Sequence, residues 1–535
     1  MTEQQNLGFG TVYLIGAGPG DPGLITVRGM ELIKKCDVIV YDRLAHPSLL
    51  NHARHDAERI YVGKASANHA MRQPDINNLL VERAREGKSV ARLKGGDPLV
   101  FGRGGEEAER CREEGVAFEF IPGVTSAIAA GAYAGIPVTH RDAASSFAVI
   151  TGHERDDEVS RQSAGAAEGR RNWKNIAWAA DTLIFLMGVE NLSEISARLI
   201  EHGRDPETPV GLVQWGTWPR QRVVTGILSS IVETVAQAGI TSPAVCIVGE
   251  VVRLREKLRW FDDITIRPLF GKRILVTRAR EQASALSDAL LALGAEPVEF
   301  PTIRIVPRAE APALLAAIQH IGAYRWLVFT STNSVDQFGI WLTRAGKDSR
   351  ALAGLKVAAI GPATAHQVTI KLGIVADYIP AEAVAEAVLS GWPDPEMSGT
   401  SVLIPRAAEA REVLPEGLRN LGARVDVIPV YDTVLDTSSA DALLDELKNG
   451  QLTALTFTSS STVTNFLEAI GSPDEATLKS LLSDVDVFVI GPITARTLRD
   501  AGIEPNVSAE KHTIPGLIEA ISGYYASKAS DLSHA

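Results

Sequence analysis

Cysteine is scarce in this sequence of 535 residues. Only Cys36, Cys111 and Cys246 occur, and no two of them are closely spaced. This spacing excludes a disulfide framework and a paired-cysteine metal motif, and it is typical of a protein in a reducing compartment. The sequence therefore predicts no metal site.

Long apolar runs and an excess of basic residues are also missing. No stretch of about 18 apolar residues is present to cross a bilayer, and the N-terminus MTEQQNLGFG lacks the regions of a signal peptide. The formal net charge of -12 argues against a protein that binds nucleic acid or an anionic membrane. We expect a soluble, cytoplasmic protein with small-molecule ligands, and a few Arg and Lys residues in one cleft would still bind an anionic substrate.

The composition is that of a globular protein with several domains, because 45% of the residues are hydrophobic and the chain is too long for one core. Short apolar runs alternate with segments of helical periodicity and with Gly and Pro, which predicts an α/β architecture with largely parallel sheets. These runs include residues 12–15, 38–40, 183–186 and 244–248. The charged segment 154–171 lacks apolar periodicity and is interpreted as a surface loop.

A new strand, RILVT, begins after Gly271, and we place the main domain boundary there. The predicted parts are an N-terminal tail (1–10), a first domain (11–261, with subdomains 11–122 and 123–261), a linker (262–270), a second domain (271–522) and a C-terminal tail (523–535).

The second domain contains an internal repeat. Residues 271–301 match residues 399–429 at an offset of 128, which pairs Arg278 with Arg406. FTSTNSVDQF and FTSSSTVTNF match at the same offset, and GPATAH matches GPITAR at an offset of 130. A duplicated unit of this size predicts two similar lobes with a cleft between them, and such clefts are favoured places for small-molecule sites.

The first strand, VYLIG, runs into the glycine-rich loop GAGPGDPG and then into a helical pattern. Glycines after a parallel strand let the backbone approach a ligand closely, and the next helix presents free N–H groups. A dinucleotide-binding oxidoreductase has a similar loop, and Asp42 lies near the position that would hold a ribose hydroxyl there. The loop alone is equally compatible with an S-adenosyl ligand.

Eight further loops follow probable strands. They are VYDR, VGK, RLKGGDPLVFGRGGEE, IPGVTSA, GIPVTHR, TGH, FLMG and SPAVCIVGEVV. In order and spacing, this series resembles the uroporphyrinogen-III C-methyltransferase family, including the methylase module of sirohaem synthase, over about residues 11–261. The resemblance implies a two-subdomain tetrapyrrole methylase fold and S-adenosylmethionine as methyl donor.

The resemblance also implies which residues line the S-adenosylmethionine pocket. They are Pro19, Gly95, Gly96, Asp97, Val100, Thr125, Ser126, Met187, Gly216, Pro243 and Ala244. Glycine backbone can contact the ligand, and a carboxylate and hydroxyls can complete its hydrogen bonds. The family usually has Thr-Ala where this chain has Thr125-Ser126. From the residue type alone, Met187 is also compatible with a place in the core.

The same resemblance implies that Asp42 accepts a proton and that Lys64 donates one. Methyl transfer to an electron-rich ring carbon needs no protein nucleophile, so positioning and one base suffice. A loop-capping role for Asp42 and a solvated surface position for Lys64 are the alternatives. Arg43, Arg103, His140 and Arg141 lie in the same loops and are candidates to bind substrate carboxylates, although each could form a structural ion pair instead.

The second domain has no paired carboxylates, metal-spaced cluster, nucleophile elbow or phosphate loop. The segments RILVTR, VFTSTNSV, AAIGPATA, IPVYDT, TFTSSS and VIGPITARTLRDAGI give residues 271–522 a resemblance to uroporphyrinogen-III synthase. It implies a fold of two flavodoxin-like lobes, one formed by 271–302 plus 433–522 and the other by 303–432. It also implies that hydroxymethylbilane is closed to uroporphyrinogen III, with inversion of the last ring and without a cofactor.

Tyr431 is the candidate proton donor of this domain, with Thr364, Ser459, Ser460 and Thr494 as substrate-binding groups. Turn capping is the alternative role of the Ser and Thr residues, and folding the substrate for closure needs no special acid. Together the two resemblances predict a bifunctional enzyme that makes precorrin-2 for sirohaem or cobalamin synthesis, with a homodimer formed through the methyltransferase half. The alternative is a nicotinamide-dependent oxidoreductase followed by a non-catalytic bilobal binding or regulatory module.

Overall fold

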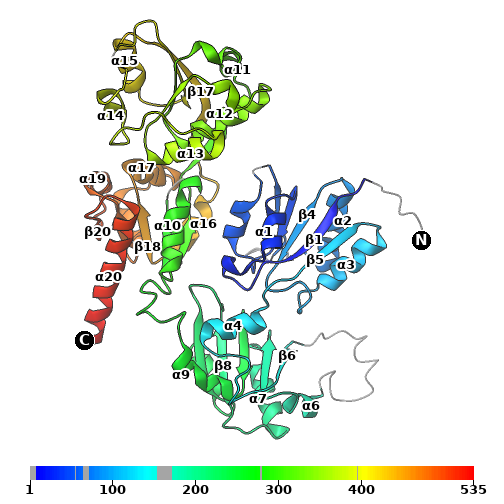
Figure 1. Ribbon diagram of the computed structural model, residues 1–535. Helices are drawn as coiled ribbons and strands as arrows, with labels where there is room; N and C mark the ends of the chain where they lie inside the picture. The colour runs from blue at the N-terminus through cyan, green and yellow to red at the C-terminus, as the bar shows by residue number, and fades with distance from the viewer. Residues whose placement is uncertain are drawn as a thin grey trace. The chain divides into compact units, whose positions relative to one another are not determined.

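The computed structural model describes residues 8–54, 56–63, 71–153, 172–277, 280–394 and 396–534. The predicted loop 154–171, Lys64 and Arg278 lie outside these ranges. The chain divides into two compact units, Met1–Ile274 with Asp288–Pro297 and Ser522–Ala535, and Leu275–Ser287 with Val298–Ile521 (Figure 1). Within the described ranges, none of the helices combines the length and apolar character needed to cross a membrane.

The first subdomain is built on a five-stranded sheet in which every neighbouring pair is parallel. Its strands, in spatial order, are β3 (Glu58–Tyr61), β2 (Val38–Tyr41), β4 (Val90–Lys94), β1 (Thr11–Gly16) and β5 (Ala117–Ile121). Helix α1 (Val27–Ile33) packs against one face of the sheet, while α2 (Gln73–Arg85) and α3 (Gly104–Glu113) pack against the other. The short helices η1 (Pro22–Leu24) and η2 (Pro47–His52) complete this layer structure.

This strand order differs from that of a dinucleotide-binding fold. In that fold the first and second strands are neighbours, which brings the acidic residue after the second strand to the ribose. Here β4 lies between β1 and β2. Asp42, which follows β2, therefore does not occupy the ribose-binding position that the oxidoreductase hypothesis assigned to it.

The second subdomain contains a mixed sheet. Its order is β6 (Phe147–Thr151), β7 (Thr182–Leu186), β10 (Ala244–Val248), β8 (Pro209–Gln214) and β9 (Arg222–Ile227). Only β6 and β7 are parallel, so the prediction of largely parallel sheets is wrong here. The connection between β8 and β9 is too short for a parallel crossover, which requires a dozen or more residues. The helices of this subdomain are α4 (Ser126–Ala134), α6 (Trp173–Ala177), α7 (Leu192–Glu201), α8 (Ile231–Gln237), η3 (Glu250–Leu254) and α9 (Arg255–Leu258).

The segment expected to be a linker packs against the first unit. Phe261 and Leu269 are buried, and the Phe261 ring lies 4.7 Å from the ring of Tyr133 in α4. Arg255 forms an ion pair with Asp262. The two ends of segment 262–270 are therefore held by side-chain contacts, whereas residues 264–266 between them are exposed.

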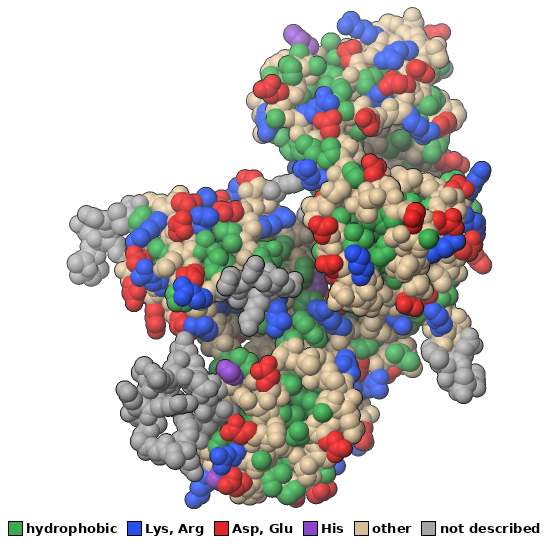
Figure 2. Space-filling view, turned by 180° about the vertical axis from the view of Figure 1, so that it is seen from behind, with side chains coloured by type: hydrophobic (Ala, Val, Ile, Leu, Met, Phe, Trp, Pro, Cys, Tyr) green, Lys and Arg blue, Asp and Glu red, His purple; other side chains and the backbone are tan. Residues whose placement is uncertain are grey.

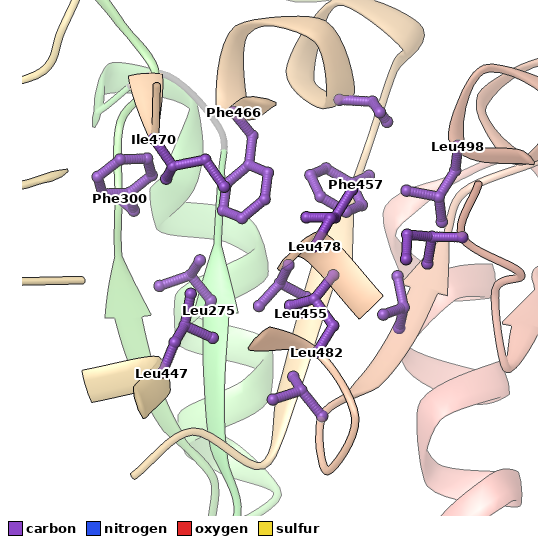
Figure 3. Packing of buried hydrophobic residues seen from close by; sticks show 14 of the residues in the cluster. Leu275, Phe300, Leu447, Leu455, Phe457, Phe466, Ile470, Leu478, Leu482 and Leu498 are labelled. Atoms are coloured by element: carbon purple, nitrogen blue, oxygen red, sulfur yellow. The ribbon is translucent and has the colours of Figure 1, made fainter. Parts of the chain in front are cut away.

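The second half of the chain has two sheets. The first has the order β12 (Glu296–Glu299), β11 (Arg273–Val276), β18 (Ala454–Phe457), β19 (Asp486–Val489) and β20 (Val507–Ser508). In chain order this is 2-1-3-4-5, the flavodoxin-like arrangement. Its core contains Leu275, Phe300, Phe457 and Phe466, whose side chains converge in Figure 3. Helices α10 (Arg280–Ala292), α16 (Ala440–Lys448), α17 (Ser460–Ala469), α18 (Glu475–Leu481), α19 (Pro492–Asp500) and α20 (Ile514–His534) belong to this part of the chain.

The second of these sheets has the order β13 (Ile303–Pro307), β17 (Arg424–Leu435), β16 (Ser401–Ala407), β14 (Trp326–Phe329) and β15 (Lys356–Ala359). Strand β13 is an antiparallel edge strand, and the neighbouring pairs β17–β16, β16–β14 and β14–β15 are parallel. Its helices are α11 (Pro312–Gln319), η4 (Ile321–Ala323), α12 (Thr332–Arg344), η5 (Ser349–Leu352), α13 (Pro362–Leu372), α14 (Ala385–Ser390) and α15 (Val413–Asn420).

The internal repeat explains the likeness of the two lobes. The repeat pairs β11 with β16, β12 with β17 and β14 with β18, so the order β12-β11-β18-β19 in one lobe equals β17-β16-β14-β15 in the other. Each lobe thus combines strands from both copies of the repeat, and the predicted flavodoxin-like bilobal fold is confirmed. The C-terminal segment differs from the predicted tail, because α20 continues to His534 and Tyr525 is buried.

Candidate active site

The first unit contains a cleft of about 610 Å³ that is lined from both of its sheets. Nine residues of the predicted cofactor set line it: Pro19, Gly95, Gly96, Val100, Ser126, Met187, Gly216, Pro243 and Ala244. Asp42, Arg43 and Arg103 line the same cleft. These twelve residues come from seven separate stretches of the chain, and most of them lie where a strand ends or a helix begins.

Asp97 and Thr125 make other contacts. The Asp97 carboxylate accepts hydrogen bonds from the backbone N–H of Leu99 (2.8 Å) and of Gly123 (3.0 Å). The Thr125 hydroxyl accepts one from the N–H of Ala127 and caps α4. Neither residue is among those that line the cleft. In this structure both side chains hold the loops that form its wall.

Two further predicted residues are not brought to the cleft. His140 and Arg141 lie in an exposed turn, where the ring of His140 accepts from the backbone N–H of Asp142. Their loop precedes β6 and does not reach the cleft wall, so the structure gives no support for their binding substrate there. Lys64, the predicted proton donor, lies outside the described residues.

Unusual backbone conformations gather around the cleft. Six non-glycine residues of the described ranges have positive φ, and four of them line it: Phe101 (φ 54°), Arg103 (φ 61°), Met187 (φ 58°) and Trp215 (φ 48°). A fifth, Thr217 (φ 73°), lies beside Gly216. Such conformations are costly for residues with a Cβ atom and cluster at functional sites, where the surrounding packing enforces them.

The glycine-rich loop that follows β1 is packed too tightly for side chains. A Cβ atom on Gly16 would lie 2.5 Å from the Cα of Gly123, and one on Gly20 would lie 2.2 Å from the Trp218 ring. The Trp218 indole N–H also donates to the carbonyl of Pro19 (3.2 Å). These contacts fix the loop against the 215–221 turn and leave Pro19 facing the cleft.

Asp42 is held from two sides. Its Oδ1 accepts from the backbone N–H of Leu44 (3.0 Å), and its Oδ2 accepts from Nη2 of Arg92 (3.1 Å). The side chain keeps 24% of its surface exposed, and it lines the cleft. Asp42 therefore combines the loop-capping role with access to a ligand, so the two interpretations of this residue are compatible.

Several residues of the cleft were not anticipated. Trp215 and Trp218 line it, and the Arg220 guanidinium lies 3.9 Å and 4.7 Å from their ring centres. His46 packs on Trp218 with ring centres 4.6 Å apart, and burial, opposed in part by the charge of Asp21, lowers its pKa to about 4. The sequence QWGTWPRQ places two tryptophans around Gly216, and this pair of aromatic residues beside a predicted cofactor residue could have indicated that they belong to the site.

In the second half, Tyr431 lies in β17 and is buried. Its hydroxyl is 3.0 Å from the hydroxyl of Ser331, which caps α12 by accepting from the N–H of Ser334. Burial raises the pKa of Tyr431 above its ordinary value, whereas the hydrogen bond with Ser331 acts in the opposite direction. The phenol is therefore neutral at physiological pH and holds a proton that it can donate.

The four predicted binding groups of this half occupy helix N-termini. Ser459 caps α17 by accepting from the N–H of Thr462, and Ser460 is the first residue of that helix. Thr364 in α13 and Thr494 in α19 are only 5% and 4% exposed. Capping explains Ser459, as the alternative interpretation held, and little of either threonine side chain is accessible to a ligand in this conformation.

Comparison with known proteins assigns both halves. The family model of Tetrapyrrole (Corrin/Porphyrin) Methylases matches residues 11–232, and that of Uroporphyrinogen-III synthase HemD matches residues 284–519. The protein is thus an enzyme of tetrapyrrole biosynthesis. It belongs to the family of porphyrin biosynthesis proteins in which a uroporphyrinogen-III C-methyltransferase is fused to a uroporphyrinogen-III synthase. The oxidoreductase alternative is not supported.

Three relatives illustrate the match. The chain is 38% identical over 512 residues to the porphyrin biosynthesis protein HemD of Ruminiclostridium josui, covering 96% of this chain and 97% of the relative. It is 45% identical to a uroporphyrinogen-III C-methyltransferase of Bacillus subtilis, covering 62% of this chain and 65% of the relative. A crystal structure of uroporphyrin-III C-methyl transferase from Thermus thermophilus, complexed with S-adenyl homocysteine, is 39% identical with a TM-score of 0.38, and it covers 46% of this chain and 100% of that one.

Proposed function

We propose that the second half closes hydroxymethylbilane to uroporphyrinogen III with inversion of the last ring, and that the first half methylates this product twice to give precorrin-2. The observation that carries the proposal is the cleft of the first unit, where the predicted cofactor residues, Asp42 and four residues with positive φ meet. The relative crystallised with S-adenyl homocysteine supports S-adenosylmethionine as methyl donor.

The residues of the cleft fit such a donor. Its volume of about 610 Å³ is in the range of small-molecule sites, and Gly95 and Gly96 present backbone without side chains to it. Met187, with half of its surface exposed, adds an apolar sulfur, which argues against the alternative of a purely core residue. When bound, S-adenosylmethionine supplies an electrophilic methyl group. The chain has to align donor and acceptor in this cleft and to exclude water from them.

Asp42 is the proposed base. It removes the proton that the ring system loses after methylation, and its hydrogen bonds to the N–H of Leu44 and to Arg92 keep the carboxylate in one orientation. Arg43 and Arg103 are the proposed anchors for acetate and propionate side chains of the substrate. Arg103 is paired with Glu106, so substrate carboxylates must compete with that pair. Lys64 remains the proposed proton donor.

In the second half, the proposed proton donor for loss of the terminal hydroxyl is Tyr431. Burial raises its pKa, so it keeps its proton at physiological pH, and its hydroxyl lies 3.0 Å from that of Ser331. Ser460, Thr364 and Thr494 are proposed to contribute hydrogen-bonding groups at the N-termini of their helices. Most of the rate gain is expected from folding the flexible substrate for closure, which is an entropic contribution. We also propose a homodimer formed through the methyltransferase half.

The experiment treats the two reactions separately in the full chain. Hydroxymethylbilane alone should give the type III isomer of uroporphyrinogen, as resolved by chromatography after oxidation. Isothermal titration should show binding of S-adenosylmethionine and none of NAD. Production of only the type I isomer, at the spontaneous rate, would refute the synthase assignment, and binding of NAD alone would refute the methyltransferase assignment.

A further inference from the structure

Charged side chains lie in the middle of the first sheet. Strand β4 occupies the central position of that sheet, and all five of its residues are buried. Two of them are nevertheless Arg92 and Lys94, each only 4% exposed. Because they are two positions apart on a strand, both side chains lie on the same face of the sheet. Both line the cleft.

Glu107 of α3 joins these two cations. It is 0% exposed, and its Oε1 accepts from Nζ of Lys94 (2.7 Å) and from Nε of Arg92 (3.4 Å). Nε2 of Gln73 in α2 donates to the same oxygen (3.0 Å). Strand β4 and helices α2 and α3 are thus joined by hydrogen bonds to one buried carboxylate oxygen, next to two residues that line the cleft.

Arg92 extends this cluster to Asp42. Its Nη2 lies 3.1 Å from Oδ2 of Asp42, and its Nη1 donates to the carbonyl of Leu93 (2.7 Å). A continuous series of contacts therefore runs from Glu107 through the guanidinium of Arg92 to the carboxylate that faces the cleft. A planar guanidinium is suited to this because its donors point in fixed directions.

Stability does not explain the cluster. Burying charges has a large desolvation cost, and apolar side chains of similar volume commonly leave stability unchanged or higher. Burial, followed by the charge of Arg92, lowers the pKa of Lys94, so its charged form is less favoured here than in water. Oε2 of Glu107 is buried and has no hydrogen-bond partner among the residues that the structure describes, which is a further cost.

We propose that Glu107 is a positioning residue for methyl transfer: it anchors Arg92, and Arg92 in turn holds Asp42 in the orientation needed to take the proton. The inference rests on the proposed role of Asp42. Lys94 balances the charge of Glu107 and keeps its Oε1 turned toward β4. Neither Glu107 nor Arg92 has to touch the substrate.

The test uses Glu107→Gln and Arg92→Lys in the full chain. Misplacement of a catalytic group by about 1 Å can lower a rate about 100-fold, so we expect kcat for methylation to fall about 10- to 100-fold in both variants. The KM for S-adenosylmethionine should change less than about threefold, and synthase activity of the same chain should be unchanged. Arg92→Lys keeps the charge, so its loss of rate would show that the geometry of the guanidinium matters. Glu109→Gln, at an exposed position of the same helix, is the matched control and should behave as the wild type.

The triple variant Arg92→Met, Lys94→Met, Glu107→Leu distinguishes a positioning role of the cluster from a role in stability alone. It should fold with a melting temperature at least that of the wild type and still lose methylation. The proposal is overturned if a folded Glu107→Gln or triple variant methylates within about twofold of the wild type, or if KM rises in parallel with the fall in kcat. If the triple variant does not fold, the result for Glu107→Gln decides. Wild type and Asp42→Asn are measured in the same assay, so that failure of the Glu107 proposal can be told from failure of the proposed function. An inactive wild type would refute the proposed methyltransferase function, and a fully active Asp42→Asn would refute the proposed role of Asp42.

Discussion

Replacing Asp97 by alanine tests how the cofactor loop is held. The carboxylate accepts from Leu99 N–H at an exposed position and from Gly123 N–H at a half-buried one, so it joins the 95–103 loop to the start of the α4 loop. A hydrogen bond to a charged group contributes about 1.5 to 3 kcal/mol, and the exposed one contributes at the low end of that range. Removing both should therefore cost roughly 3 to 4.5 kcal/mol.

This loss is shared between folding and binding, because the loops can be ordered by the cofactor. We expect the Kd for S-adenosylmethionine to rise at least about tenfold, which corresponds to about 1.4 kcal/mol. Calorimetric titration measures the Kd, and thermal unfolding measures the part of the lost free energy that destabilises the fold. Asp205→Ala removes one exposed hydrogen bond to the N–H of Glu207 in the same half and serves as control. An unchanged Kd together with an unchanged melting temperature would show that the carboxylate does not organise these loops.

Three further predictions concern single side chains. Asp42→Asn should keep S-adenosylmethionine affinity and lower the methylation rate about 100-fold or more, since only the proton-transfer step is lost; an unaltered rate removes Asp42 from the mechanism. Burial lowers the pKa of His46 from 6.5 to about 4, so the folded state favours the neutral ring. Its contribution to stability is therefore complete above pH 6.5 and is lost as the pH falls toward 4. Urea unfolding should therefore show about 2 kcal/mol less stability at pH 5 than at pH 7 from this group, and His46→Phe should remove that difference. Tyr431→Phe should lower synthase turnover about tenfold or more without affecting methylation; full turnover would leave substrate folding as the whole mechanism.

The sequence predicted most of the fold because its signals were local or repeated. Apolar runs gave the positions of β1, β2, β7 and β10, and the repeat gave the two lobes. The antiparallel pairing of β8 with β9 was missed, since apolar runs do not show strand direction. The helix to His534 was missed because no packing partner is evident for it in the sequence.

The site was predicted less completely, for physical reasons that differ between residues. Asp97 was assigned to the cofactor, but a short carboxylate in a loop can equally accept hydrogen bonds from backbone amides. The sequence does not distinguish these two roles, whereas the folded loop shows the second. His140 and Arg141 were placed by their motif, but their turn before β6 does not contribute to the lining of the cleft. Arg92 and Lys94 could have been noticed as two charges in an otherwise apolar strand, whereas their partner Glu107 depends on how α3 packs.

The surface shown in Figure 2 mixes acidic and basic side chains without a continuous basic patch, in keeping with the net charge of -12. For the polycarboxylate substrate proposed above, the cleft offers individual cations such as Arg43 and Arg103. A few charge-assisted hydrogen bonds suffice for this, because each is about twice as strong as a neutral one.

The account is tested most directly by giving the full chain hydroxymethylbilane and S-adenosylmethionine with a deuterated methyl group, and analysing the product by mass spectrometry. We predict a type III tetrapyrrole that carries two labelled methyl groups, formed only when both substrates are present. A product with the type I ring arrangement, or a type III product without label, would contradict the claim that one chain performs both steps.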